Sequence, residues 1–191
     1  LLSFLKDYFV ILLSFICFLI CIIKVSINDW MFLYFFKEKC YSFFISNICV
    51  FFFEIGGFVS IFFSCVFINK FFFGNRILYF VFFSFFFFIF FLFFYINSLK
   101  IFFIDIFFMF FIGFFIFSFY MVIGLISIES VDKMYSSTIN SIISFFGYIG
   151  VTVSCYPLGY IIDYSWNFYF FFLFINIVLI FVFIVIFFFK V

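Results

Sequence analysis

One lysine inside a long apolar segment, Lys24, is the residue of this sequence with the clearest capacity for chemistry. It belongs to a row of residues spaced three or four apart, which share one helical face: Ser14, Cys17, Cys21, Lys24 and Asn28. If this segment crosses a membrane, a cation at such depth costs roughly 2.5–3.5 kcal/mol even on the scale taken from insertion experiments. A lysine kept there should face a watery cavity and bind an anion, and its compact charge suits a phosphate group. Lys24 and Asn28 are therefore the predicted ligand-binding residues.

The same lysine has a second interpretation. Its four-carbon stem could carry the ammonium past Asn28 to the membrane interface, in which case Lys24 would bind no ligand. Two acidic residues are candidate charge partners for Lys24, because Asp29 and Glu54 could neutralise it when no anion is bound. An exchange of such ion pairs would couple binding to a conformational change.

Further polar residues lie within the apolar segments and could line the same cavity. These cavity-facing candidates are Tyr120, Asn140, Ser144 and Tyr148. The four-residue ladder Gly56, Ser60 and Ser64 is more simply a packing seam, because small residues let helix backbones approach closely.

A polar loop follows the second apolar segment and contains Asn69, Lys70, Gly74 and Arg76. Gly74 permits a tight turn. The two cations should lie at cytoplasmic helix ends, near the negative end of the helix dipole and near anionic lipid. Four other acids near segment ends are expected to be solvated boundary charges: Asp105, Glu129, Asp132 and Asp163.

Several classes of chemistry are excluded by what the sequence lacks. It has no His, no nucleophile–base set, no phosphate-binding Gly loop and no metal-ligand spacing, so we expect neither an enzyme nor a metal or other cofactor. The net charge of +1 provides no electrostatic footprint for nucleic acid. The six cysteines form no CxxC pair, and most lie in apolar segments as small fillers.

The composition indicates an integral membrane protein. Hydrophobic residues make up 72% of the 191 residues and charged residues only 9%, against roughly 25% charged in soluble domains. A soluble domain of this size cannot hide so much apolar surface. We therefore expect the protein to lie in a lipid bilayer, which could be that of the plasma membrane, the endoplasmic reticulum or an organelle.

Polar clusters divide the chain into six apolar segments, each long enough to cross about 30 Å of hydrocarbon as a helix. The predicted spans are residues 8–28, 42–68, 77–96, 102–128, 136–162 and 167–189 of a single all-α domain over 1–191. With the N-terminus inside, five basic residues (Lys6, Lys70, Arg76, Lys133 and Lys190) are cytoplasmic and three (Lys37, Lys39 and Lys100) are not.

The six spans differ in polarity. The third and sixth are almost purely apolar, whereas the first, second, fourth and fifth carry polar or small residues along one face. A polar face must turn toward protein or water. The four striped spans should therefore surround an interior, with the third and sixth outside it, as in one repeat of a secondary transporter.

Short runs along the chain, in order, resemble the C-terminal half of a transporter family. They are Lys24–Trp30, Glu54–Gly57, Gly74–Arg76, Ile112–Phe114, Ile123–Gly124, Gly147–Gly150, Gly159–Tyr160 with Asp163, and Trp166. Together they resemble the organophosphate:phosphate antiporters of the major facilitator superfamily. Lys at position 24 and the Glu54–Gly57 run are most similar to the glucose-6-phosphate translocase branch.

The resemblance implies specific roles. The residue matching Lys24 holds the substrate phosphoryl group, with the acids matching Asp29 and Glu54 close by. Asn69 stands where the family usually has Asp, so the family's cytoplasmic ion pair is not expected here. The chain matches the second half only, and an N-terminal six-helix half, in the same gene or on a second chain, is the implied partner.

The expected function is exchange of a phosphorylated sugar or glycerol for inorganic phosphate by alternating access. Three alternatives remain: a sensor that binds sugar phosphate without transport, an organelle-encoded respiratory membrane subunit, and a membrane protein in which Lys24 has only a packing role.

Overall fold

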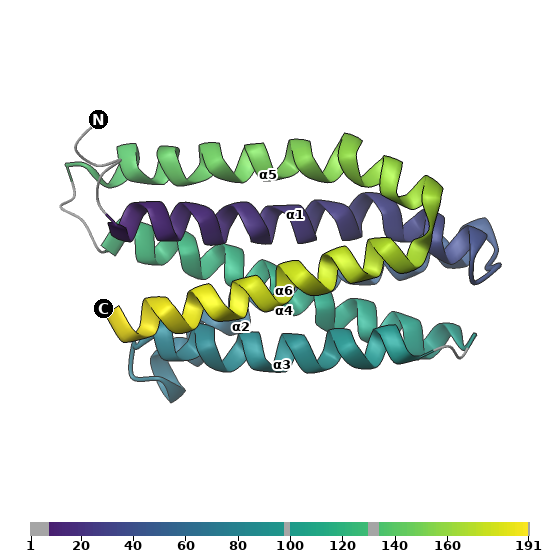
Figure 1. Ribbon diagram of the computed structural model, residues 1–191. Helices are drawn as coiled ribbons and strands as arrows, with labels where there is room; N and C mark the ends of the chain where they lie inside the picture. The colour runs from purple at the N-terminus through teal and green to yellow at the C-terminus, as the bar shows by residue number, and fades with distance from the viewer. Residues whose placement is uncertain (1–7, 98–99, 130–133, 191) are drawn as a thin grey trace.

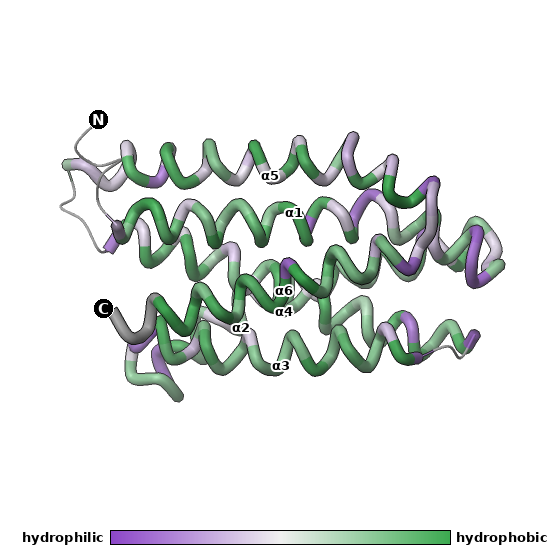
Figure 2. Tube along the Cα trace, viewed as in Figure 1, coloured by the Kyte–Doolittle hydropathy of each residue, from purple (hydrophilic) through white to green (hydrophobic). Residues whose placement is uncertain are grey.

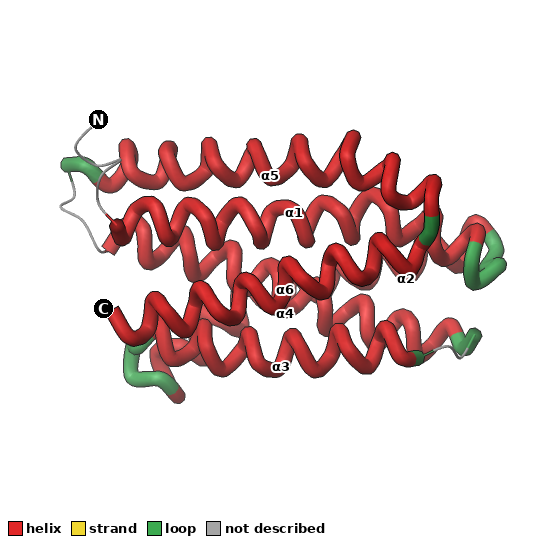
Figure 3. Tube along the Cα trace, in the orientation of Figure 1, coloured by secondary structure: helices red, strands yellow, loops and turns green. Residues whose placement is uncertain are grey.

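A computed structural model describes residues 8–97, 100–129 and 134–190, and these form six long helices (Figures 1 and 3). The helices are α1 (Tyr8–Lys37), α2 (Phe43–Phe71), α3 (Arg76–Ile96), α4 (Phe102–Glu129), α5 (Ser136–Tyr164) and α6 (Trp166–Lys190). All six are long and apolar enough to cross a membrane. The chain is an integral multi-pass membrane protein, as predicted. Lys6, Asp132 and Lys133, which the sequence placed at the membrane surface, lie outside the described residues.

The helices run side by side along one axis, and α1 begins at the same end of the bundle at which α6 ends (Figure 1). Figure 2 shows hydrophobic residues along most of each helix, with many of the hydrophilic residues near the two ends. Apolar side chains along the helices suit the lipid bilayer. The helical backbone suits it too, because a helix satisfies its own hydrogen bonds where lipid offers none.

The first helix is longer than the sequence suggested. The predicted span over residues 8–28 lies within it, and α1 continues to Lys37. Asn28 and Asp29 are exposed on one side of the helix, while Met31 and Phe35 on the following turns are fully buried. Burial of these residues keeps the chain helical beyond the polar pair. The helix ends at Lys37, and Cys40 in the connection that follows adopts the left-handed region at φ 57°.

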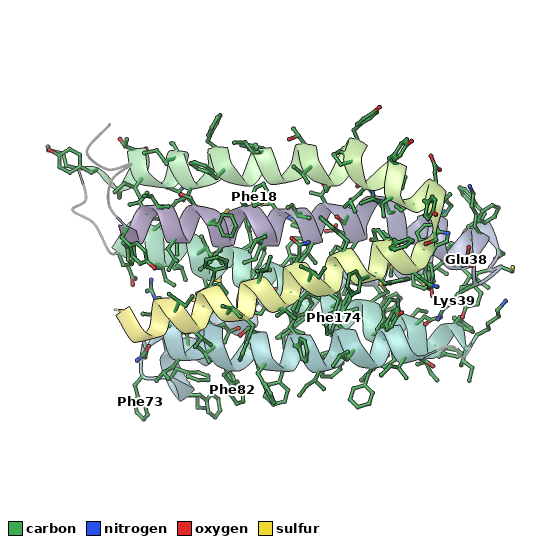
Figure 4. The ribbon with its side chains drawn as sticks, in the orientation of Figure 1. Phe18, Glu38, Lys39, Phe73, Phe82 and Phe174 are labelled. Atoms are coloured by element: carbon green, nitrogen blue, oxygen red, sulfur yellow. The ribbon has the colours of Figure 1, made fainter. Side chains whose placement is uncertain are left out.

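The turn predicted at Gly74 is present. Gly74 has φ 81°, and its amide donates to the Ile68 carbonyl at the end of α2. The next residue, Asn75, caps α3 by accepting a hydrogen bond from the Leu78 amide at 3.2 Å. Phe73, which lies in this turn, projects away from the bundle (Figure 4).

Two closely packed helix pairs form the core of the bundle. α1 packs against α5 and α2 against α4, and contacts of α1 with α2 and α4, and of α4 with α5, join the pairs. α3 and α6 pack on each other, α3 also on α4, and α6 also on α1 and α5. In the most apolar part of each of α3 and α6, 39% of the residues are buried, against 33% in those of α2 and α5, so the placement of the third and sixth spans outside the other four stays a prediction.

The α2–α4 pair depends on two glycines that allow the backbones to touch. A Cβ on Gly56 would lie 2.0 Å from the Phe110 carbonyl oxygen, and a Cβ on Gly113 would lie 2.0 Å from the Phe53 carbonyl oxygen. Further along the seam, Ser60 and Ser64 are buried, and Ser64 donates a 2.8 Å hydrogen bond to Ser118 of α4. The ladder Gly56, Ser60 and Ser64 is therefore a packing seam, as predicted.

Gly56→Ala is expected to destabilise the protein by roughly 1–3 kcal/mol, because the new methyl group would push backbone against backbone. Gly124→Ala on α4 is the matched control, since nothing lies within 4 Å of a Cβ there and alanine favours a helix by about 1 kcal/mol. Thermal unfolding in detergent micelles measures both variants. Equal melting temperatures for Gly56→Ala and the unsubstituted protein would contradict the proposed close contact.

Candidate functional site

The Lys24 ammonium is directed from α1 toward α4. Its Nζ lies 4.2 Å from the ring centroid of Phe117 and 5.1 Å from that of Tyr120. The residue is half-buried and stands near the middle of α1. The side chain therefore does not follow the helix toward an interface, as the snorkelling interpretation requires.

The charge of Lys24 is not cancelled by a carboxylate in this structure. Among residues 8–97, 100–129 and 134–190, no Asp or Glu oxygen lies within 4.0 Å of its Nζ. Asn28 donates instead to the Asp29 carboxylate at 3.1 Å, and both residues are exposed, as is Glu54 on α2. Ring faces attract a cation without neutralising it, so these contacts leave the charge of Lys24 in place.

The four cavity-facing candidates fall into three groups. Tyr120 lies beside Lys24 with its side chain partly exposed. Asn140 accepts a 3.2 Å hydrogen bond from Ser127 and so joins α5 to α4, while Ser144 is half-buried on α5. Tyr148 is 71% exposed on α5. Among these candidates, Tyr120 contacts the Lys24 ammonium.

Two residues of the row that precede Lys24, Cys17 and Cys21, pack against a neighbouring helix. Cys17 and Cys21 are buried, and a Cβ built on Gly147 of α5 would lie 3.2 Å and 3.1 Å from their sulfur atoms. Gly150 similarly meets the Phe18 carbonyl of α1. The row therefore contributes a packing seam against α5 through Cys17 and Cys21, and a cation–ring contact with α4 through Lys24.

At the end of the bundle where α1 begins, an ion pair joins α3 to α4. Arg76, in the first turn of α3, pairs with Glu129 in the last turn of α4. The Glu129 side chain is exposed as expected, but it has a partner that the sequence did not reveal. Asn69 and Lys70 are exposed at the end of α2.

At the opposite end, the expectation for Asp105 is wrong. Asp105 is fully buried, and its two carboxylate oxygens accept hydrogen bonds from Lys39 Nζ at 2.5 Å and from the Tyr41 hydroxyl at 2.7 Å. Figure 4 labels Lys39 at this end, on the connection between α1 and α2. Burial and the hydrogen bond to Asp105 raise the pKa of Tyr41, so its hydroxyl stays protonated and donates.

We call Lys39, Tyr41 and Asp105 the buried cluster. It ties the α1–α2 connection to the first turn of α4. An acid in a first turn also interacts favourably with the helix dipole. This position in the helix was the one feature of the sequence that could have indicated a structural role for Asp105. The expectation failed because a lysine and a tyrosine in a short connection look like solvated residues until the fold brings them to Asp105.

Comparison with known proteins adds an independent observation. No family model matches the chain. It is 31% identical over 157 residues to a probable hexose phosphate transport protein of Chlamydia muridarum, and 30% identical over 157 residues to one of Chlamydia trachomatis. A probable hexose phosphate transport protein of Chlamydia pneumoniae is 31% identical over 152 residues. All three are named as transport proteins.

The similarity covers most of this chain but only part of each relative. It extends over 81% of the chain and 34% of the relative for the first two, and over 78% and 33% for the third. The chain thus spans about a third of the length of the curated relatives that it matches.

Proposed function

We propose that this chain is the C-terminal six-helix half of an organophosphate:phosphate antiporter of the major facilitator superfamily. The observation that carries the proposal is the Lys24 ammonium. It lies at mid-helix, points into the bundle and has no carboxylate partner within 4.0 Å among the described residues. A cation left in this state is costly in lipid unless an anion or water meets it.

The proposed substrate is a phosphorylated sugar or glycerol, exchanged for inorganic phosphate. Lys24 supplies a point charge for the phosphoryl group, and Asn28, one turn further along α1, supplies an exposed amide. The names of the chlamydial relatives support a hexose phosphate as the sugar component. Both anions then compete for one ammonium, which is the simplest basis for exchange.

The proposed partner is an N-terminal six-helix half, in the same gene or on another chain. In the most apolar part of α2, and likewise of α5, only 33% of the residues are buried, against 72% in α1. Their exposed residues include groups that lipid does not favour: Glu54 on α2, and Tyr148, Thr152, Tyr156 and Tyr160 on α5. Covering these groups with a second bundle would place the substrate site between the two halves.

Counterflow in proteoliposomes tests the proposal. The protein is purified from its own membrane, so that any associated half is retained, and is reconstituted with internal unlabelled phosphate. External labelled phosphate and labelled glucose 6-phosphate are expected to enter only when a phosphorylated compound is present inside. Binding of glucose 6-phosphate without counterflow would instead favour the sensor, and co-purification with a respiratory complex would favour the respiratory subunit.

A further inference from the structure

We infer that Gly57 is a positioning residue for Lys24, and that it acts through the ring of Phe117. The three residues come from three helices: Gly57 from α2, Phe117 from α4 and Lys24 from α1. Neither Gly57 nor Phe117 was among the binding residues predicted from the sequence. The choice of anion in the transport test below rests on the proposed function, but the placement of the ammonium does not.

The contact between Gly57 and Phe117 is closer than any side chain would allow. A Cβ on Gly57 would lie 2.5 Å from Cδ2, 2.6 Å from Cγ and 2.8 Å from Cε2 of the Phe117 ring. The ring therefore lies directly on the α2 backbone, in space that only glycine leaves open. Phe53, also on α2, holds the ring edge-on, with 5.8 Å between the ring centroids.

The same ring carries the ammonium on its face, with Lys24 Nζ 4.2 Å from its centroid. A cation over a ring face is attracted by the ring quadrupole, and the attraction is stronger where water is excluded. Since Phe117 is held from the α2 side, its position fixes how far the Lys24 side chain extends from α1. A methyl group on Gly57 would force the ring to shift and would remove the surface on which the ammonium rests.

The two glycines of the Gly56–Gly57 pair thus have different roles. A Cβ on Gly56 meets backbone atoms of α4, so a substitution there separates two helices. The three atoms nearest to a Cβ on Gly57 all belong to the side-chain ring of Phe117, which can move without separating the helices. Gly57→Ala should therefore change the site more than it changes stability.

Chemical labelling tests the placement of Lys24 without reference to transport. The purified protein in micelles is treated briefly with acetic anhydride, and acetylation of each lysine is followed by mass spectrometry. We expect Lys24 in Gly57→Ala to react several-fold faster than in the unsubstituted protein, because the ring no longer covers the amine. Lys70 and Lys100, both exposed, are internal references in the same sample.

A double-mutant cycle tests whether Gly57 acts through Phe117. Phe117→Leu alone should also expose Lys24, and adding Gly57→Ala to it should change nothing further, because the clashing ring is gone. Gly124→Ala, with open space around its Cβ, should label as the unsubstituted protein does. An unchanged Lys24 rate in Gly57→Ala, or additive effects in the double variant, would overturn the inference.

Transport kinetics provide a readout that separates positioning from stability. In the counterflow assay, Gly57→Ala is expected to raise KM for phosphate about fivefold with little change in the maximal rate per folded protein, as loss of ~1 kcal/mol of cation–ring attraction implies. A lower maximal rate at unchanged KM would contradict a positioning role. If the unsubstituted protein shows no counterflow, the proposed function fails, and the labelling result still decides the inference.

Discussion

Lys24→Gln is expected to lower phosphate and sugar-phosphate exchange roughly 10- to 100-fold. The substitution keeps a long polar side chain but removes the charge, and a hydrogen bond to a charged group contributes about 1.5–3 kcal/mol. The Lys24 ammonium stands over Phe117 and Tyr120 with no carboxylate within 4.0 Å among the described residues. Its loss would therefore leave the substrate phosphoryl group without its counter-charge on this half. Initial rates of counterflow in proteoliposomes measure the effect.

Two matched variants make the Lys24 result specific. Lys24→Arg keeps the charge and should retain a substantial part of the exchange, although its wider guanidinium must be placed against the same rings. Lys100→Gln removes a charge from an exposed position and should leave exchange unchanged. Unchanged uptake by Lys24→Gln would refute the assigned role and would favour the alternative in which Lys24 has only a packing role.

Asp105→Ala is expected to lower the free energy of unfolding by about 3–5 kcal/mol. The substitution leaves Lys39 buried without its partner and removes the acceptor of the Tyr41 hydroxyl. The Lys39 side chain is only 5% exposed, so water cannot replace the lost carboxylate without local opening. Thermal or detergent-induced unfolding in micelles measures the change.

Asp163→Ala is the control for this prediction, because Asp163 is an exposed acid at the same end of the bundle and should change stability by less than about 0.5 kcal/mol. The double variant Lys39→Met with Asp105→Leu should recover most of the loss, since no unpaired charge then stays buried. A loss in Asp105→Ala no larger than that in Asp163→Ala would show that the buried cluster is open in solution.

The six helices could be predicted because the information for each is local. A segment of about 20 apolar residues must satisfy its own backbone in lipid, whatever its neighbours are. The sequence did not show how far the first helix continues beyond its predicted span, because that depends on burial by other helices, as at Met31 and Phe35 beyond the polar pair at positions 28 and 29. In the longer helix, Lys24 lies near the middle of α1.

The glycine pair on α2 shows where sequence reasoning stops. Two adjacent glycines in an apolar segment indicate close packing, and Gly56 meets the α4 backbone as that reading requires. Nothing in the sequence distinguishes Gly57, which meets one aromatic ring of α4. Phe117 shares a helical face with Gly113, Tyr120 and Gly124 in the sequence, but that spacing does not show that its ring meets Gly57 and Lys24.

The sequence by itself determined that this is a six-helix membrane protein and that the charge of Lys24 needs a purpose, because both follow from the cost of polar groups in hydrocarbon. The tertiary structure decided which groups contact that charge and which other charged residues are buried with a partner. Lys24 meets rings of α4, and Lys39 meets Asp105, 66 residues away in the chain. Such contacts depend on the rotation and register of helices against one another, and these are set by packing across the whole bundle.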